Sequence, residues 1–152
     1  MLNMRLVGTS LPPLYYEVEK GQLRFFAKTV GETDAIYFDE TAAQKAGYRS
    51  IIAPPTFGFS IVRGAAEQMP LITALEWSDE EIARCLHGEQ RFRYGKAICA
   101  GDVIRIDETV KDAYQKKKGA LQFYVTQTQL TNQLGENVGE MEMSLILNGA
   151  IS

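Results

Sequence analysis

Residues 30–61 read VGETDAIYFDETAAQKAGYRSIIAPPTFGFSI, and the rest of the chain is organised around this stretch. It opens with a glycine turn into a polar loop that carries Glu32, Asp34 and Tyr37. A helix start is predicted near its end, where Pro55 suits the first helical position because the missing N–H would be unpaired there anyway. Polar side chains and unpaired backbone donors therefore converge at a helix N-terminus, which suits a thioester carbonyl or a phosphate.

Three helices are predicted in and around this stretch. An apolar stripe at helical spacing predicts a helix over residues 21–30, ended by Gly31. A small helix is predicted over residues 39–46, with Gly47 as a left-handed cap. The helix predicted over residues 55–68 is apolar almost all round, which is typical of a buried helix, and its glycines indicate close approach by another backbone.

The second half of the chain alternates between apolar and polar residues. The alternating segments lie at residues 86–94, 103–106, 120–125 and 139–148, and short turns separate them, so an antiparallel meander is predicted. Residues 14–19 are expected to add an edge strand. One buried helix followed by a long antiparallel sheet predicts an α+β fold in which the sheet wraps round the helix, the hotdog arrangement. Hotdog sheets commonly pair edge to edge, so a dimer is expected.

Length and composition exclude several classes of protein. The 152 residues suffice for one domain with a sizeable core, so residues 1–152 are expected to form a single hotdog domain. A net charge of −3 gives no electrostatic basis for binding nucleic acid. No apolar run reaches membrane-spanning length and no signal peptide is recognisable, so we expect a cytoplasmic protein. Cys85 and Cys99 are predicted to be reduced and structural, and the single histidine excludes a multi-histidine metal site within one chain. We expect neither a metal nor a cofactor.

Three stretches are distinctive: residues 26–32 (FAKTVGE), residues 52–57 (IAPPTF), and residues 86–90 (LHGEQ), which lead on to Gly101 and Asp102. In this order and spacing they resemble the MaoC-like hotdog dehydratases, a family that includes R-specific enoyl-CoA hydratases. The resemblance is greater still to the branch called the fatty-acid-synthase-type dehydratase N-terminal domain. It implies a hotdog fold and acyl thioesters of coenzyme A or of an acyl carrier protein as substrates.

The catalytic positions of that family are changed in this chain. Active members carry Gly-Asp-x-Asn-Pro-x-His in the loop and Ala-His-Gly at the start of the central helix, whereas this chain has Glu32, Tyr37 and Pro55 there. Glutamate for aspartate displaces the carboxylate, and a misplacement of about 1 Å can reduce the rate on the order of a hundredfold. Tyrosine is a poor base near neutrality because its reference pKa is about 10. Proline lacks the N–H of the oxyanion hole, whose loss costs roughly 3–4 kcal/mol, although Thr56 offers an N–H one residue on.

These changes favour a subunit of an enoyl-CoA hydratase or 3-hydroxyacyl-thioester dehydratase that lacks the Asp/His dyad and needs a catalytic hotdog partner. The chain would then be a homodimer when alone and a heterodimer in its active form. If it acts by itself, Glu32 is the best residue to hold water and His87 the best proton donor, provided that the strand at His87 passes beside the loop, within the chain or across a dimer. The candidate catalytic residues are therefore Glu32, Tyr37 and His87, and the candidate substrate-binding residues are Asp34, Pro55, Thr56 and Phe57.

Structural alternatives exist for these residues, and two other functions remain open. Glu32 would otherwise be a solvated carboxylate at a helix end, Tyr37 and Phe57 packed aromatics, and His87 a structural histidine. The second function is a hotdog thioesterase in which Glu32 or Asp34 activates water against the thioester. The third is a non-catalytic module that binds acyl thioesters.

Overall fold

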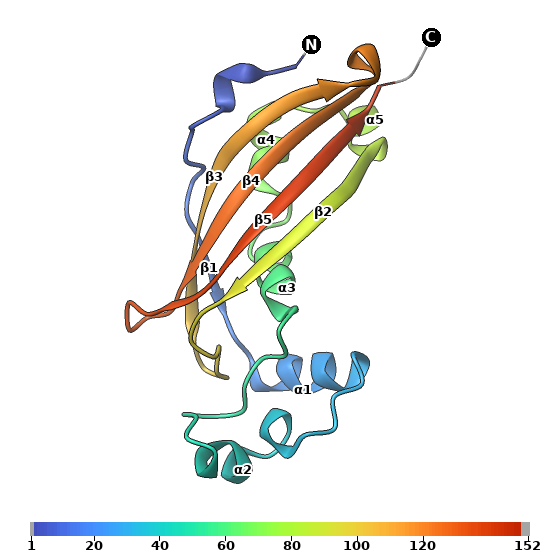
Figure 1. Cartoon of the computed structure of the whole chain (residues 1–152). Helices are drawn as coiled ribbons and strands as arrows, with labels where there is room; N and C mark the ends of the chain where they lie inside the picture. The colour runs from blue at the N-terminus through green and yellow to red at the C-terminus, as the bar shows by residue number, and fades with distance from the viewer. Residues whose placement is uncertain (1, 150–152) are drawn as a thin grey trace.

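A curved five-stranded sheet forms the body of the protein (Figure 1). The computed structural model describes residues 2–149. Every pair of neighbouring strands is antiparallel, in the order β1-β3-β4-β5-β2. The strands are β1 (Leu14–Glu17), β2 (Cys85–Tyr94), β3 (Val103–Lys116), β4 (Leu121–Thr131) and β5 (Asn137–Asn148).

Helices cover one face of this sheet and extend beyond one of its ends. Figure 1 shows α3, α4 and α5 behind the sheet, and α1 and α2 below it. The helices are α1 (Lys20–Thr29), α2 (Glu40–Lys45), α3 (Phe57–Gly64), α4 (Pro70–Leu75) and α5 (Asp79–Ala83), with short 3₁₀ turns η1 (Met4–Leu6), η2 (Ala35–Tyr37) and η3 (Lys117–Gly119). Within residues 2–149, each helix is too short or too polar to traverse a lipid bilayer.

Local signals in the sequence account for the helix ends. The Asp39 carboxylate accepts a hydrogen bond from the N–H of Ala42 at 2.6 Å and so caps α2. Gly47 follows α2 with a φ of +93°, which confirms the left-handed cap. Ser78 and Glu81 form a capping box at α5, each side chain accepting a bond from the other's backbone N–H.

The strand order corrects the expected four-strand meander. β3, β4 and β5 follow one another as hairpins, but β2 pairs with β5 and not with β3. The link between β2 and β3 explains the difference. Its Cys99 forms an isolated antiparallel β-bridge with Ile52, and its Ile98 carbonyl accepts a hydrogen bond from Ala53 N–H at 2.8 Å. The link thus holds the segment that enters α3. It crosses from the β2 edge of the sheet to the opposite edge, where β3 begins beside β1. The expected edge strand is present as β1.

The central helix α3 is shorter than predicted. It ends at Gly64 and not near residue 68, because Pro70 opens α4 and the residue before it, Met69, is held in an extended conformation with a ψ of 131°. The glycines of α3 approach side chains and not a backbone. A Cβ on Gly64 would lie 2.7 Å from the Tyr16 ring, whereas a Cβ on Gly58 would make an ordinary contact of 3.4 Å with Leu130.

The core consists of two hydrophobic clusters on the helix-bearing face of the sheet. The first surrounds α3, whose Phe57, Ile61 and Val62 are buried against β3, β4 and β5. The second lies under α4, whose Leu71 and Ile72 pack with side chains of the same strands nearer their other ends. The sheet therefore encloses the helix face that the sequence pattern marked as apolar, as expected for a hotdog fold.

Candidate functional site

The loop after α1 is fixed by the way that helix ends. Gly31 has a φ of +82°, and its N–H donates to the Lys28 carbonyl at 3.2 Å. The N–H of Glu32 donates to the Ala27 carbonyl at 2.9 Å. These two bonds form a Schellman motif, which needs a left-handed residue such as glycine. Glu32 is therefore held at the end of α1 by its backbone while its half-buried side chain remains available.

The structure brings Glu32, Asp34 and Tyr37 together. The Asp34 carboxylate caps η2 by accepting a bond from the Ile36 N–H at 3.1 Å, so it has a structural role. The pKa of Tyr37 is raised above its ordinary value, first by partial burial and then by the carboxylates of Glu32 and Asp34. Tyr37 is consequently a neutral phenol near neutral pH, able to donate a hydrogen bond and unsuited to act as a base.

The entry to α3 corrects the prediction that Pro55 is the first residue of that helix. Helix α3 begins at Phe57 with Thr56 as its N-cap, so Pro55 precedes the helix. The N–H of Phe57 donates to the Pro54 carbonyl at 3.0 Å across a tight turn. Pro55 is the second residue of that turn, a position that proline favours because its φ is already suitable. Pro55 and Thr56 are exposed, and Thr56 makes no side-chain capping bond.

Phe57 lies in the core. It is 3% exposed, and its ring packs edge-on against the ring of Phe26 with centroids 5.2 Å apart. In this position the side chain supports the end of α1 from which the loop leaves.

His87 lies far along the sheet from the loop. Its ring stacks on that of Phe59 with centroids 5.0 Å apart, near the beginning of β2. The opposite end of β2, at Phe92 and Tyr94, lies beside Pro55. His87 and Phe92 are five residue steps apart along the strand, a length of about 16 Å. Within one chain the structure therefore does not bring His87 to Glu32, and their pairing across a dimer stays a prediction.

A pocket of about 240 Å³ opens beside His87, at the edge of β2. Its walls are mostly apolar and come from α3, α4, α5, β2 and β5: Phe59, Arg63, Met69, Ile72, Ile82, Cys85, His87, Met143 and Leu145. Sequence reasoning missed this pocket because its residues are far apart along the chain. Burial raises the pKa of the Cys85 thiol, and the nearby Arg63 partly offsets this effect.

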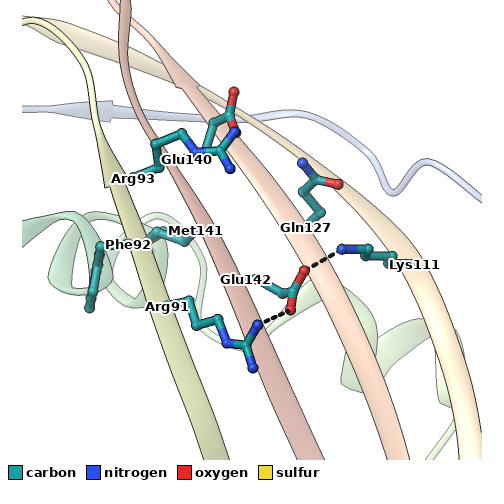
Figure 2. Close-up of a pocket in the computed structure, with 8 residues that line it drawn as sticks. All are labelled: Arg91, Phe92, Arg93, Lys111, Gln127, Glu140, Met141 and Glu142. Atoms are coloured by element: carbon teal, nitrogen blue, oxygen red, sulfur yellow. Dashed lines mark hydrogen bonds and ion pairs between the residues drawn. The ribbon is translucent and has the colours of Figure 1, made fainter.

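A larger hollow, of about 370 Å³, lies on the opposite face of the sheet (Figure 2). Its charged side chains pair with one another: Glu142 contacts both Lys111 and Arg91, and Arg93 lies 3.5 Å from Glu140. Arg91 and Arg93 are thus already opposed by carboxylates. The hollow is remote from the loop, and we assign the site to the helix-bearing side.

A buried aspartate, which the sequence analysis named in a distinctive stretch without giving it a role, holds the entry to α3 in place. Asp102 is 0% exposed and accepts bonds from the Arg49 guanidinium at 2.6 Å, the Cys99 N–H at 2.9 Å and the Gln133 amide at 3.1 Å. These bonds tie three distant segments together. The only local signal was that Asp102 follows Gly101, a turn glycine with a φ of +88°.

Helices α1 and α2 are joined in a similar way. The Glu40 carboxylate accepts bonds from the Lys20 ammonium at 2.6 Å and from the Ser50 hydroxyl at 3.0 Å. The bond from Lys20 is the main cause that lowers the pKa of Glu40, so the ion pair persists at neutral pH. Within residues 2–149, no three His, Cys, Asp or Glu side chains are grouped so as to hold a metal ion.

Comparison with protein families gives one match over most of the chain. Residues 5–141 match the family described as "FAS1-like, dehydratase domain region". A UPF0336 protein of Streptomyces coelicolor is 40% identical over 111 residues, which are 72% of each chain. A UPF0336 protein of Leifsonia xyli is 32% identical over 149 residues, which are 97% of each chain.

Solved structures confirm the hotdog fold. The HadBC complex of Mycobacterium tuberculosis, described as a 3R-hydroxyacyl-ACP dehydratase, contains a chain that is 26% identical, with a TM-score of 0.77 over 93% of this chain and 96% of that one. The R-hydratase PhaJ1 of Pseudomonas aeruginosa matches 94% of this chain and 82% of its own, at 17% identity and a TM-score of 0.71. The ChsH1-ChsH2 complex of M. tuberculosis covers 95% of this chain and all of its own, at 16% identity and a TM-score of 0.70.

Proposed function

Because the chain belongs to the family of FAS1-like dehydratase domain regions, whose structural relatives are MaoC-like hotdog hydratases, we propose that it is the supporting subunit of a two-chain enzyme. That enzyme would hydrate enoyl thioesters or dehydrate 3-hydroxyacyl thioesters of coenzyme A or acyl carrier protein. The catalytic aspartate and histidine would come from a hotdog partner.

The state of the loop beside α3 carries this proposal. By the resemblance, Tyr37 corresponds to the family's histidine, and its raised pKa keeps it protonated near neutral pH, so that it cannot accept a proton there. Asp34 is engaged in capping η2, and Pro55 has no N–H to offer a thioester oxygen. Among the described residues of the loop, only Glu32 retains a free carboxylate, and the one histidine of the chain lies at the far end of β2. The loop therefore lacks the acid–base pair that the reaction requires.

The free edge of the sheet provides a place for the partner. The edge of β3 is covered by β1 and by residues 8–11, where Gly8 N–H donates to the Val110 carbonyl and Leu11 N–H to the Glu108 carbonyl, both at 2.8 Å. The other edge, β2, pairs only with β5 in the described part of the chain and spans ten residues. An uncovered edge of this length is suited to pairing with another strand. The HadBC and ChsH1-ChsH2 complexes, each of two different subunits by name, support a partner of the same fold.

The pocket beside β2 is where this subunit would hold the acyl chain of the substrate. It opens at the edge where the partner would pair, and its walls are mostly apolar with Arg63 and His87 as polar groups. Such a pocket suits an alkyl chain whose thioester lies in the partner's active site. In this arrangement the supporting subunit holds the acyl chain while the partner performs the proton transfers.

Coexpression with a candidate partner tests the proposal. The chain would be purified alone, and also together with a hotdog subunit from the same genome that carries Gly-Asp-x-Asn-Pro-x-His. Crotonyl-CoA hydration and free thiol would be measured in parallel. We expect no hydration by the chain alone and hydration by the complex, with no thiol released.

Each other outcome has a definite meaning. Hydration by the chain alone contradicts the proposal, because the loop would then contain a working acid–base pair. Thiol release by the chain alone supports a thioesterase in which Glu32 activates water. Thioester binding without turnover, in the chain and in every complex, supports the non-catalytic binding module.

A further inference from the structure

A layer of polar side chains crosses the helix-bearing face of the sheet between the two hydrophobic clusters. Glu108 on β3 is 4% exposed although it shares its face with Ile106 and Val110. Its neighbour across the strands is Thr128, and Thr126 is 0% exposed on the same face of β4. A carboxyl and two hydroxyls thus occupy positions where the alternation of the strands calls for apolar residues.

Several atoms of this layer lack a hydrogen-bond partner within residues 2–149. They are Oε1 of Glu108, Oγ1 of Thr126, and both amide atoms of Gln90 on β2. A buried polar group without a partner is unfavourable by about 1–3 kcal/mol, so such groups in a folded protein call for an explanation. One explanation is a ligand that supplies the missing partner.

Met143 separates the pocket beside β2 from this layer. Met143 forms part of the pocket wall, and it lies opposite Gln90 on one neighbouring strand and opposite Thr126 on the other. Methionine is unbranched and adapts its conformation easily. A chain that enters the pocket and displaces the Met143 side chain therefore meets the Gln90 amide on one side and the Thr126 hydroxyl on the other.

We propose that the pocket prefers acyl chains that carry a hydroxyl or oxo oxygen far from the thioester, which Gln90 and Thr126 bind by hydrogen bonds. This inference rests on the proposed function and names the class of substrate. The amide of Gln90 can donate and accept, and so can the hydroxyl of Thr126, so the site suits either oxygen. An unsubstituted alkyl chain would leave the same atoms unpaired, and a site built to hydrogen-bond its ligand discriminates against the analogue that lacks the group.

Glu108 supports Thr126 from behind. Its carboxyl faces the hydroxyls of Thr126 and Thr128, and burial raises its pKa to about 7. Below that pH the carboxyl is mostly neutral and can itself donate a hydrogen bond.

A pair of matched thioesters tests the inference. Binding of decanoyl-CoA and of ω-hydroxydecanoyl-CoA to the two-chain complex would be compared by isothermal titration calorimetry. We expect the hydroxylated chain to bind about threefold to tenfold more tightly, the effect of one net hydrogen bond. Gln90→Leu and Thr126→Val should each remove this preference. Gln127→Leu is the control, because Gln127 is the next residue along β4 and lines the hollow on the opposite face.

The possible results separate the inference from the proposed function. Equal affinity of the wild-type complex for both thioesters overturns the inference and leaves the proposed function intact. Loss of the preference in Gln127→Leu as well overturns the assignment to Gln90 and Thr126. Failure of either thioester to bind contradicts the acyl pocket of the proposed function, and the inference with it.

Discussion

Single side chains decide whether the loop can transfer a proton. By the resemblance in sequence, Tyr37 corresponds to the histidine of active MaoC-like dehydratases, and burial together with the Glu32 and Asp34 carboxylates raises its pKa further from neutrality. A general acid or base works best when its pKa lies near the working pH. Tyr37 therefore stays neutral and is unsuited as a proton shuttle, and the one histidine of the chain, His87, lies beside Phe59 and not beside Glu32.

Asp102 determines whether the entry to α3 stays in place. Asp102→Asn keeps the shape of the side chain but removes the charge that accepts three bonds, from Arg49, Cys99 and Gln133. We expect the free energy of unfolding to fall by about 2–4 kcal/mol. The asparagine replaces one acceptor oxygen by an NH2 group, which then faces a donor, and the negative charge opposite Arg49 is lost. Urea unfolding followed by circular dichroism measures this change.

The matched control is Asp107→Asn. Asp107 is an exposed partner of Arg105 on the surface of β3, where an ion pair contributes little. A loss of about 0.5 kcal/mol or less is expected there. Equal losses in the two variants would show that Asp102 is not the hub described.

Glu108 should make the stability depend on pH. Its pKa is about 7 in the folded protein against 4.5 ordinarily, so the folded state holds a proton that the unfolded chain releases between these pH values. The free energy of unfolding therefore falls by up to about 3 kcal/mol as the pH rises from about 4.5 to about 7. Above about pH 7 it stays at this lower value. Glu108→Gln lacks this ionisation, so it should exceed the wild type in stability at about pH 8, with the gap closing at about pH 5. A gap that does not change with pH would contradict the buried, protonated carboxyl.

At the scale of elements, α3 connects the loop, the pocket and the core. Its first turn receives the loop through Pro54 and Phe57, and its side chains Phe59 and Arg63 line the pocket. Its eight residues are too few to be helical on their own, so packing against the sheet must maintain it. Its glycines show how close that packing is at each point.

The two glycines of α3 should respond in opposite ways to alanine. Gly58→Ala adds a methyl at ordinary contact distance from Leu130, so the gain in helix propensity should raise the free energy of unfolding by up to about 1 kcal/mol. Gly64→Ala places a methyl 2.7 Å from the Tyr16 ring and should lower it, by about 1–2 kcal/mol. Thermal unfolding of both variants checks this, and destabilisation by Gly58→Ala would show that α3 lies closer to the sheet than described.

Elements with local signals were predictable from the sequence, and those set by distant contacts were not. Gly31 and Gly47 end their helices as predicted because a left-handed cap is a property of the residue itself. The alternation of Ile104, Ile106 and Val110 would have revealed Glu108 at a core position had it been followed along β3. The pairing of β2 with β5, and the bonds that meet at Asp102, join segments far apart in sequence and leave no periodic signature. The loop's residues were located by resemblance, but the turn at Pro55 depends on how residues 52–54 are anchored.

At the scale of the whole molecule, the sheet formed by the described residues has one covered edge and one free edge. The free edge, β2, ends the face that bears α3 and lies beside the pocket that we propose for the acyl chain. We predict a homodimer when the chain is expressed alone, because an uncovered edge favours pairing with a second copy. Sedimentation that shows a monomer at micromolar concentration would contradict this.

A substitution at each edge identifies the edge that pairs. Leu86 on β2 is 53% exposed and Tyr15 on β1 is 59% exposed. Leu86→Lys should weaken the dimer about tenfold, since it places a charge at the paired edge, whereas Tyr15→Lys should leave the dimer unchanged. Weakening by Tyr15→Lys alone would place the dimer contact at β1.

The claim that this chain supports a catalytic partner is tested most directly by kcat/KM of the two-chain complex, with substitutions on one side at a time. Changing the aspartate of the partner's Gly-Asp-x-Asn-Pro-x-His motif to asparagine should lower kcat/KM for crotonyl-CoA by about a hundredfold or more. Glu32→Gln and Tyr37→Phe in this chain should change it by less than about twofold, because neither side chain would contact the reacting atoms. A loss of about tenfold or more from Glu32→Gln, with the partner's aspartate dispensable, would contradict the account and place catalysis in this chain.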